Sequence, residues 1–375
     1  MLRSPEASTG RLGAVLRAVG SPGPLRLAPG GPWLATTLDQ ARAVLADPDH
    51  FDFPMDVSRR PVRRPRSTGG PTGARGPRTS HTTTPSTTRE QVAAGRAVFA
   101  ASLDAEVAAN AGASAELDAD LILRRPVARA TTAALLGRLD ESARDAVADA
   151  VLAWIDALAP VISSPRNPSR WSRVRRAETR TRNALEALLA DVGVEDPSAT
   201  ATVLAAGIQV PIAAGAWLLV HLAATPASDE PYDPAHVAWE TIRVTPPTWV
   251  TARLTSAATR LADTELAAGE VVLVSPLLLG QLPALVPTVT SPPDVFDPDR
   301  WRRDDIRPGA WLPFGAGPHA CPGRSLGLAL LTDLARCAAR WDLVSAAPAA
   351  IDQSRGLFPV PARVGVRVPG AETRP

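Results

Sequence analysis

The residues whose types and spacing best suit a chemical role surround Cys321. They lie in the segment from position 311 to 324, which has the sequence WLPFGAGPHACPGR. Gly315 and Gly317 allow the backbone to turn tightly and to approach a flat ligand closely. Pro322 follows the cysteine at a position that the first turn of a helix tolerates. We therefore expect Cys321 at a helix N-terminus, where free amide groups and the helix dipole favour the thiolate.

A thiolate held in this way, with Phe314 beside it, is suited to axial ligation of a haem iron. The alternative is a buried structural cysteine at a loop–helix junction, which is the usual role of a single cysteine. The complete pattern Phe-Gly-x-Gly-x-His-x-Cys-x-Gly favours the metal ligand. Cys337 lies on the following helix near several leucines, and we expect it to belong to the core.

The segment resembles the haem-binding loop of the cytochrome P-450 superfamily of haem-thiolate monooxygenases. This resemblance extends well over the second half of the chain and in outline over the first. It implies haem b (iron protoporphyrin IX) as the cofactor, with Cys321 as the metal ligand and Phe314, Gly315 and Gly323 at the cofactor. It also implies one mainly α domain with minor β structure (α+β) over residues 1–375, with the haem between a central helix and the cysteine loop.

A second match to the family is the pair Glu240 and Arg243, one turn apart on a helix predicted over 235–244 and similar to a Glu-x-x-Arg motif. An isolated pair of this kind is usually a surface ion pair that contributes little stability. The sequence FDPDRW at 296–301 resembles the family segment that supplies a second arginine, here Arg300. The resemblance implies a buried, hydrogen-bonded triad that holds the cysteine loop.

A haem carries two propionates, which need cationic or hydrogen-bond-donating partners. By resemblance, Arg253 and His319 occupy positions that serve the propionates in soluble bacterial members. An ordinary strand arginine is the alternative for Arg253. His81 is the nearest match to a third partner from an early helix, although Pro85 stands where a partner arginine is expected.

Residues 204–211, with the sequence LAAGIQVP, resemble the family's central helix, where Ala-Gly-x-acid-Thr crosses the oxygen-binding face. Gln209 replaces the acid and Val210 the threonine, and an amide and an isopropyl group cannot relay protons as those residues do. Pro211 lacks the N–H that would bond the Gly207 carbonyl four residues earlier. We therefore expect the helix to open there and to leave this carbonyl free for water or substrate. Gly207, Gln209 and Val210 are the candidate catalytic positions.

The elements that must position these residues are predicted to be mostly helical. Apolar residues at three- and four-residue spacing indicate the helices. The predicted helices cover residues 38–45, 89–103, 141–158, 175–192, 199–224, 235–244 and about 322–341. Thr37 is placed to cap the first of these, and residues 271–274 form a predicted strand. The arginine-, glycine- and proline-rich residues 59–85 predict a long flexible loop.

Composition excludes several other classes of protein. The formal net charge of +2 gives no case for nucleic acid as the main partner, and the basic residues are all arginine. Two cysteines cannot build a four-thiolate zinc or iron–sulfur site, and nothing in the sequence suggests a secreted disulfide framework. The N-terminal residues 1–54 have no continuous apolar run, and the apolar residues 199–224 are interrupted by glycine and proline. We therefore expect a cytoplasmic protein without a membrane anchor.

The leading hypothesis is an oxidoreductase that uses oxygen at a thiolate-ligated haem to oxidise a small or medium biosynthetic intermediate, with electrons from a ferredoxin and its reductase. Use of peroxide, radical coupling or another outcome on the same scaffold is an alternative. A catalytically silent partner protein is a further alternative, and the retained Cys321 argues against it. Candidate substrate-pocket residues by family position are mostly apolar; they are Ile208, Gln209, Trp249, Val250, Leu357 and Phe358.

Overall fold

The computed structural model describes residues 9–53, 85–110, 115–164, 166–225, 230–288, 291–302, 307–345, 348–353 and 358–367. Its α-helices are α1 (Gly10–Arg17), α2 (Leu38–Ala46), α3 (Arg89–Asn110), α4 (Ala119–Leu135), α5 (Glu141–Ser163), α6 (Arg173–Asp191), α7 (Pro197–Ala224), α8 (Pro234–Val244), α9 (Pro276–Leu279) and α10 (Arg324–Ala338). The 3₁₀ turn η2 (Pro298–Arg302) precedes the cysteine loop, and the 3₁₀ turn η3 (Gly317–His319) lies within it. The predicted loop 59–85 lies outside the described residues, apart from Pro85.

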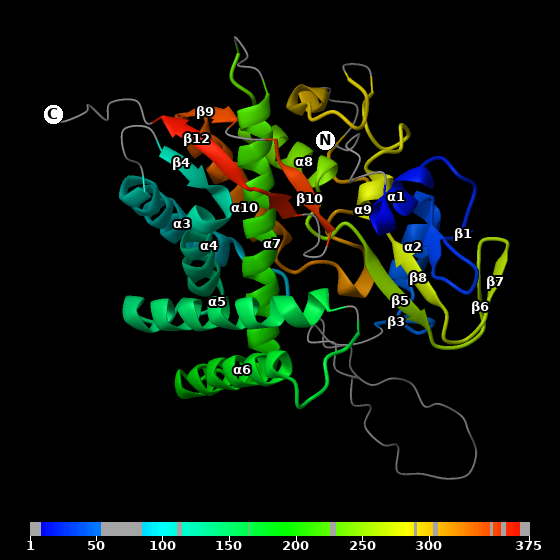
Figure 1. Cartoon of the computed structure of the whole chain (residues 1–375), viewed down its shortest axis with the longest axis horizontal. Helices are drawn as coiled ribbons and strands as arrows, with labels where there is room; N and C mark the ends of the chain where they lie inside the picture. Colours follow the sequence, from blue (N-terminus) through cyan, green and yellow to red (C-terminus); the bar gives the residue numbers. More distant parts are fainter. Residues whose placement is uncertain are drawn as a thin grey trace.

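Helix α7 is the central element, and Figure 1 shows it running the height of the molecule with α5 and α6 crossing its lower part. Its sequence is apolar on all sides, which is typical of a helix surrounded by protein. Asp196 caps the first turn by accepting a hydrogen bond from the amide of Ala199 at 2.9 Å. The helices α4, α5, α6, α8 and α10 pack around α7.

The strands form small sheets of two to five strands. The five-stranded sheet has the order β1 (Leu25–Arg26), β2 (Trp33–Ala35), β8 (Val271–Val274), β5 (Thr251–Thr255) and β3 (Phe51–Asp52). The three-stranded sheet has the order β4 (Ala115–Asp118), β12 (Arg363–Arg367) and β9 (Asp342–Ser345). Two hairpin-like pairs are β6 (Thr259–Leu261) with β7 (Thr264–Leu266) and β10 (Ala350–Asp352) with β11 (Phe358–Val360). The observed fold is the predicted mainly helical α+β class.

Local signals predicted several elements well. Thr37 caps α2 by accepting a hydrogen bond from the amide of Gln40 at 3.3 Å, as its position indicated. The predicted strand 271–274 matches β8. The last helix begins later than predicted, at Arg324, because residues 322 and 323 form a turn that carries the chain from the cysteine into the helix.

Two described helices, α5 and α7, are long and apolar enough to cross a membrane by length and composition alone. The core helix of a soluble protein meets the same criterion. In the most apolar stretch of α7, 67% of the residues are buried inside the protein, which agrees with its central position.

Candidate functional site

The loop that carries Cys321 is built by glycine and by a backbone hydrogen bond that closes it. The amide of Cys321 donates to the carbonyl of Phe314 at 2.8 Å, so the loop returns on itself. Gly315 and Gly317 have φ values of +68° and +69°, which disfavour side chains. A Cβ at Gly317 would lie 2.4 Å from the carbonyl oxygen of Leu45 at the end of α2. Glycine is therefore required there by backbone conformation and by close contact.

The two cysteines have different environments. Cys321 is exposed, whereas Cys337 is buried on α10. Partial burial of the sulfur raises the pKa of Cys321, and a hydrogen bond from the backbone of Gly323 opposes this effect. Gly323 is the N-cap of α10, so the sulfur lies just before the helix and not on its first turn. A bound metal ion would favour the thiolate.

The predicted triad assembles in the core. The side chains of Glu240, Arg243 and Arg300 are all 0% exposed. Arg243 donates to both carboxylate oxygens of Glu240, at 2.8 Å from Nε and 2.5 Å from Nη2. Arg300 Nε donates to Oε1 at 2.8 Å, and the amide of Asp297 donates to the same oxygen at 3.0 Å. Other N–H groups of the same two guanidinium groups donate to backbone carbonyls. The buried charges are therefore paired and hydrogen-bonded.

Aromatic residues connect this triad to the cysteine loop. Trp301 donates from Nε1 to Glu240 and stacks on Trp311, with ring centroids 5.3 Å apart. Trp239 contacts Trp311 edge to face at 5.9 Å and Phe314 at 6.1 Å. Sequence reasoning did not identify Trp239 or Trp301, although they directly precede Glu240 and follow Arg300. Adjacency to the triad was the signal that could have found them.

The two predicted propionate partners, Arg253 and His319, both contact the aromatic ring of Phe53. The guanidinium of Arg253 lies 3.9 Å from the ring centroid of Phe53, and His319 lies 4.9 Å from it in an edge-on arrangement. Strand pairing explains the contact, because Asp52 on β3 pairs with Leu254 on β5 and brings the next residue beside Arg253. Phe53 was missed because nothing in its local sequence indicates this pairing.

Arg253 is a buried cation with neutral hydrogen-bond partners. It is 4% exposed, and its Nη1 donates to the hydroxyl of Thr251 at 2.9 Å and to the carbonyl of Ala252 at 3.0 Å. Burial lowers the pKa of Arg253, and the negative charge of Asp52 opposes this shift. An arginine held in such a place is suited to bind an anionic group of a ligand.

The central helix differs from its predicted shape. α7 remains helical through Pro211, so the predicted opening is wrong. The Gly207 carbonyl is not left free either, because the hydroxyl of Thr131 on α4 donates to it at 3.2 Å. A tertiary hydrogen bond thus replaces the helical one that proline removes.

The neighbouring positions on α7 face different surroundings. Val210 is 39% exposed, which is unusual in the middle of a helix that is otherwise largely buried. The side-chain oxygen of Gln209 is buried, and within the described part of the chain it has no hydrogen-bond partner. An accessible isopropyl group and an unsatisfied amide oxygen therefore lie side by side in sequence.

Most of the predicted substrate-pocket residues pack into the core. Ile208 is 0% exposed, Trp249 is 6% exposed and Phe358 is 3% exposed, whereas Val250 is partly buried against the core. These three large side chains therefore line no open surface in this structure. Leu357 and His81 lie outside the described residues.

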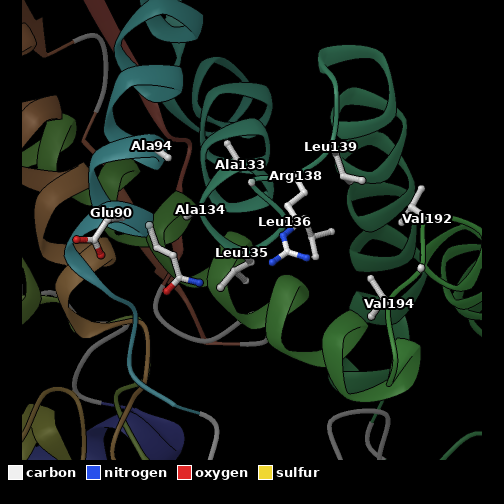
Figure 2. A pocket seen from close by; sticks show the side chains of 13 residues that line it. Glu90, Ala94, Ala133, Ala134, Leu135, Leu136, Arg138, Leu139, Val192 and Val194 are labelled. Atoms are coloured by element: carbon white, nitrogen blue, oxygen red, sulfur yellow. The ribbon is translucent and has the colours of Figure 1, made fainter.

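A cavity of about 480 Å³ lies between the start of α3, the end of α4 and the turn after α6. Figure 2 shows Glu90 on one side of it, Arg138 near its centre and Val192 with Val194 on the other side. No residue of the predicted site lines this cavity. Apolar side chains of α4, including Ala133 and Ala134, form one wall.

Comparisons with known proteins agree on one family. A family model described as cytochrome P-450 matches residues 235–332, which include Glu240, Arg253 and Cys321. The sequence is 41% identical to cyclooctatin synthase of Streptomyces melanosporofaciens over 106 residues, or 27% of this chain and 22% of that protein. It is 41% identical to cyclooctat-9-en-7-ol 5-monooxygenase of the same organism over 110 residues, or 28% of this chain and 23% of that protein. These matches span less than a quarter of each relative's length.

The likeness in structure extends over the whole chain. The open form of the cytochrome P-450 Eryk from S. erythraea superposes with a TM-score of 0.69, covering 98% of each chain at 19% identity. HmtT, involved in himastatin biosynthesis, superposes with a TM-score of 0.63 at 17% identity and covers 94% of this chain and 96% of that one. The fold is therefore shared over nearly all of its length, and the sequence match covers the triad and the cysteine loop. Residues 235–332 thus match the cytochrome P-450 family, which implies a haem cofactor, and the whole fold is similar to that of solved cytochromes P-450.

Proposed function

We propose that this protein is a haem-thiolate oxidoreductase of the monooxygenase type that oxidises a small or medium biosynthetic intermediate. The observation that carries the proposal is the exposed Cys321 on a glycine-built loop, supported from behind by a fully buried ionic triad. Burying charged groups is costly unless they are paired, so such a triad is retained where a loop must be held in one geometry. An inert structural cysteine would need neither its exposure nor this support.

The residues present fit a haem b group. Cys321 would ligate the iron, with Phe314, Gly315 and Gly323 around the sulfur. Arg253 and His319 would bind the propionates, since both are positioned on the ring of Phe53. The exposed face of Val210 on α7 fits a surface that a flat cofactor covers. When bound, haem supplies the activation of oxygen that oxidises the substrate.

The residues of α7 limit how protons reach the site. Val210 has no exchangeable proton, and the Gln209 amide has no acidic one, so neither can relay protons at ordinary pH. The Gly207 carbonyl accepts a hydrogen bond from Thr131. We therefore propose that proton delivery uses a group of the substrate or ordered water, or that peroxide serves as the oxidant. This feature supports the peroxide-using or coupling reaction as the second candidate function.

The substrate class is inferred from the relatives and from the chemistry of the site. Two relatives are named for synthesis of cyclooctatin and for oxidation of cyclooctat-9-en-7-ol, which suggests a secondary-metabolite intermediate. The partners we propose are the small-molecule substrate and a ferredoxin with its reductase, and the location we propose is the cytoplasm. We propose neither a nucleic acid nor a membrane as a partner.

The two cysteines provide a matched test of the proposed function. The reduced carbon monoxide adduct of the purified protein should show the strongly red-shifted main band of thiolate-ligated haem. Cys321→Ala should abolish this band, whereas Cys337→Ala should retain it, because Cys337 is buried on α10. Equal loss in both variants, or no haem in the wild type, would contradict the proposal.

Product analysis separates the two candidate functions. The wild-type protein should be supplied with oxygen and a ferredoxin system in one reaction, and with hydrogen peroxide alone in another. Product only with oxygen and reductant supports the monooxygenase, and equal or greater product with peroxide supports the second candidate. A folded wild-type protein that shows no haem spectrum would favour a silent partner protein.

A further inference from the structure

The hydrogen bond between Thr131 and Gly207 joins two helices at the point where α7 contains Pro211. Thr131 lies on α4 and is 1% exposed, and its Oγ1 donates to the Gly207 carbonyl at 3.2 Å. Proline has no N–H, so Pro211 cannot donate to the carbonyl four residues earlier, which is that of Gly207. We propose that Thr131 is a positioning residue whose hydroxyl replaces the missing N–H and holds the segment of α7 that carries Val210.

The physical need for such a donor is clear. A buried carbonyl without a partner raises the free energy of the folded state, and a proline inside a helix usually bends it. α7 nevertheless stays helical from Pro197 to Ala224. The hydroxyl of Thr131 satisfies the carbonyl from outside the helix, so α7 can contain proline without opening.

Glycine allows α4 to come close enough for this contact. A Cβ at Gly207 would lie 3.1 Å from Cγ2 of Thr131, and a Cβ at Gly215 would lie 2.8 Å from Cδ1 of Leu123. The two contacts are eight residues apart on each helix and run in opposite directions along the two sequences. α4 and α7 therefore pack antiparallel over two turns, and the position of Thr131 is set by that packing.

The consequence for the site follows from helical spacing. Val210 lies three residues after Gly207, and the two share one side of α7. A shift of the Gly207 turn would therefore move the accessible side chain of Val210. The position of Val210 relative to the haem rests on the proposed function, whereas the coupling between Thr131 and Pro211 does not.

A double-mutant cycle in the haem-loaded protein tests the coupling. Thr131→Val removes the hydroxyl at nearly constant shape and should raise the unfolding equilibrium constant about tenfold, because it leaves the partly buried Gly207 carbonyl without its donor. In the Pro211→Ala background the new amide supplies the helical hydrogen bond. In that background the same Thr131→Val change should raise the unfolding equilibrium constant by about twofold or less.

Thr132 provides the matched control, since it is the next residue on α4 and is 0% exposed. Within the described part of the chain its hydroxyl has no hydrogen-bond partner. Thr132→Val should therefore leave the unfolding constant unchanged or lower it. Equal effects of Thr131→Val and Thr132→Val, or the same cost of Thr131→Val in both backgrounds, would overturn the coupling.

Imidazole, a small ligand of haem iron, tests whether Thr131 positions the distal segment. Thr131→Val should change the Kd for imidazole by about threefold or more, because one or two weak contacts to the ligand would change. The Kd is read from the shift of the main haem band. Thr131→Ser, which keeps the hydroxyl, should restore the wild-type value. Coupling without any change in imidazole affinity would reduce Thr131 to a structural cap and contradict the positioning role. If the wild type binds no haem, the proposed function fails, and the same unfolding cycle run on the haem-free protein still decides the coupling.

Discussion

The indole Nε1 of Trp301 donates a 2.9 Å hydrogen bond to Oε2 of Glu240. Trp301 also stacks on Trp311, the residue that begins the cysteine segment. One carboxylate therefore accepts hydrogen bonds from Arg243, Arg300 and an indole that contacts the loop. This geometry connects the buried charges of the triad to the loop that carries Cys321.

Removing that carboxylate should destabilise the protein strongly. Glu240→Ala leaves two buried guanidinium groups without their anion, and breaking a buried ion pair from one side costs roughly 3–5 kcal/mol. We expect little soluble, haem-loaded protein. Urea unfolding and haem content per chain measure the effect. Glu265→Ala is the control, because that carboxylate is 71% exposed in its pair with Arg260 and contributes about 0–1 kcal/mol. A fully loaded Glu240→Ala protein of wild-type stability would contradict the structural role of the triad.

Arg253 should determine how tightly the haem is retained. Arg253→Gln keeps a polar side chain but removes the cation that we propose binds a propionate, and it should increase haem transfer to apomyoglobin by about tenfold or more. Arg260→Gln on β6 is the control, since this arginine is exposed and pairs with Glu265. Identical rates of haem loss from both variants would mean that Arg253 does not bind the haem and has only a structural role in β5 and in the contact with Phe53.

His221 makes the stability of the fold depend on pH. Burial lowers the pKa of His221 to about 3, and the positive charge of Arg243 acts in the same direction. Its Nε2 lies 3.0 Å from Oγ1 of Thr245, and its ring stacks on Phe296 at a centroid distance of 4.5 Å. The folded protein thus holds His221 neutral between helices α7 and α8.

This histidine should lower stability as the pH falls below about 6.5, the ordinary pKa of an unfolded histidine. The unfolded chain then binds a proton that the folded chain excludes, and the loss reaches about 2 kcal/mol at pH 5. Urea unfolding from pH 7.5 to pH 5 measures it. His221→Phe keeps the aromatic contacts and should have a shallower slope over this range. Equal slopes for the variant and the wild type would show that His221 binds a proton in the fold.

Val210→Thr should not improve turnover of the native substrate. The site contains Gln209 in place of the usual acid, so a hydroxyl at position 210 has no carboxyl to exchange protons with. The double variant Gln209→Glu with Val210→Thr should raise oxygen consumption without matching product. Product formed per oxygen consumed, with and without peroxide, is the measurement. A large increase in product formed, with one product per oxygen consumed, from Val210→Thr alone would contradict this prediction. It would show that the absence of the threonine only lowers the activity.

Local sequence determined much of this protein. The glycines, Cys321 and Pro322 are neighbours in the chain, so their spacing alone indicated a ligand loop. Glu240 and Arg243 are one helical turn apart, and their pairing follows from helix geometry. The long amphipathic and apolar helices were equally visible, since periodicity is a local property.

The tertiary structure decided the features that depend on distant segments. Periodicity did not predict α4, whose sequence is rich in alanine and arginine and contains Pro126. Phe53 reaches Arg253 only because β3 pairs with β5. The rule for proline in a helix predicted an open turn at Pro211, but it considered only the bonds within one helix. Thr131, which is 76 residues away from Gly207, supplies the missing donor, and no local pattern can specify a hydrogen bond between two helices that only the packed fold brings together.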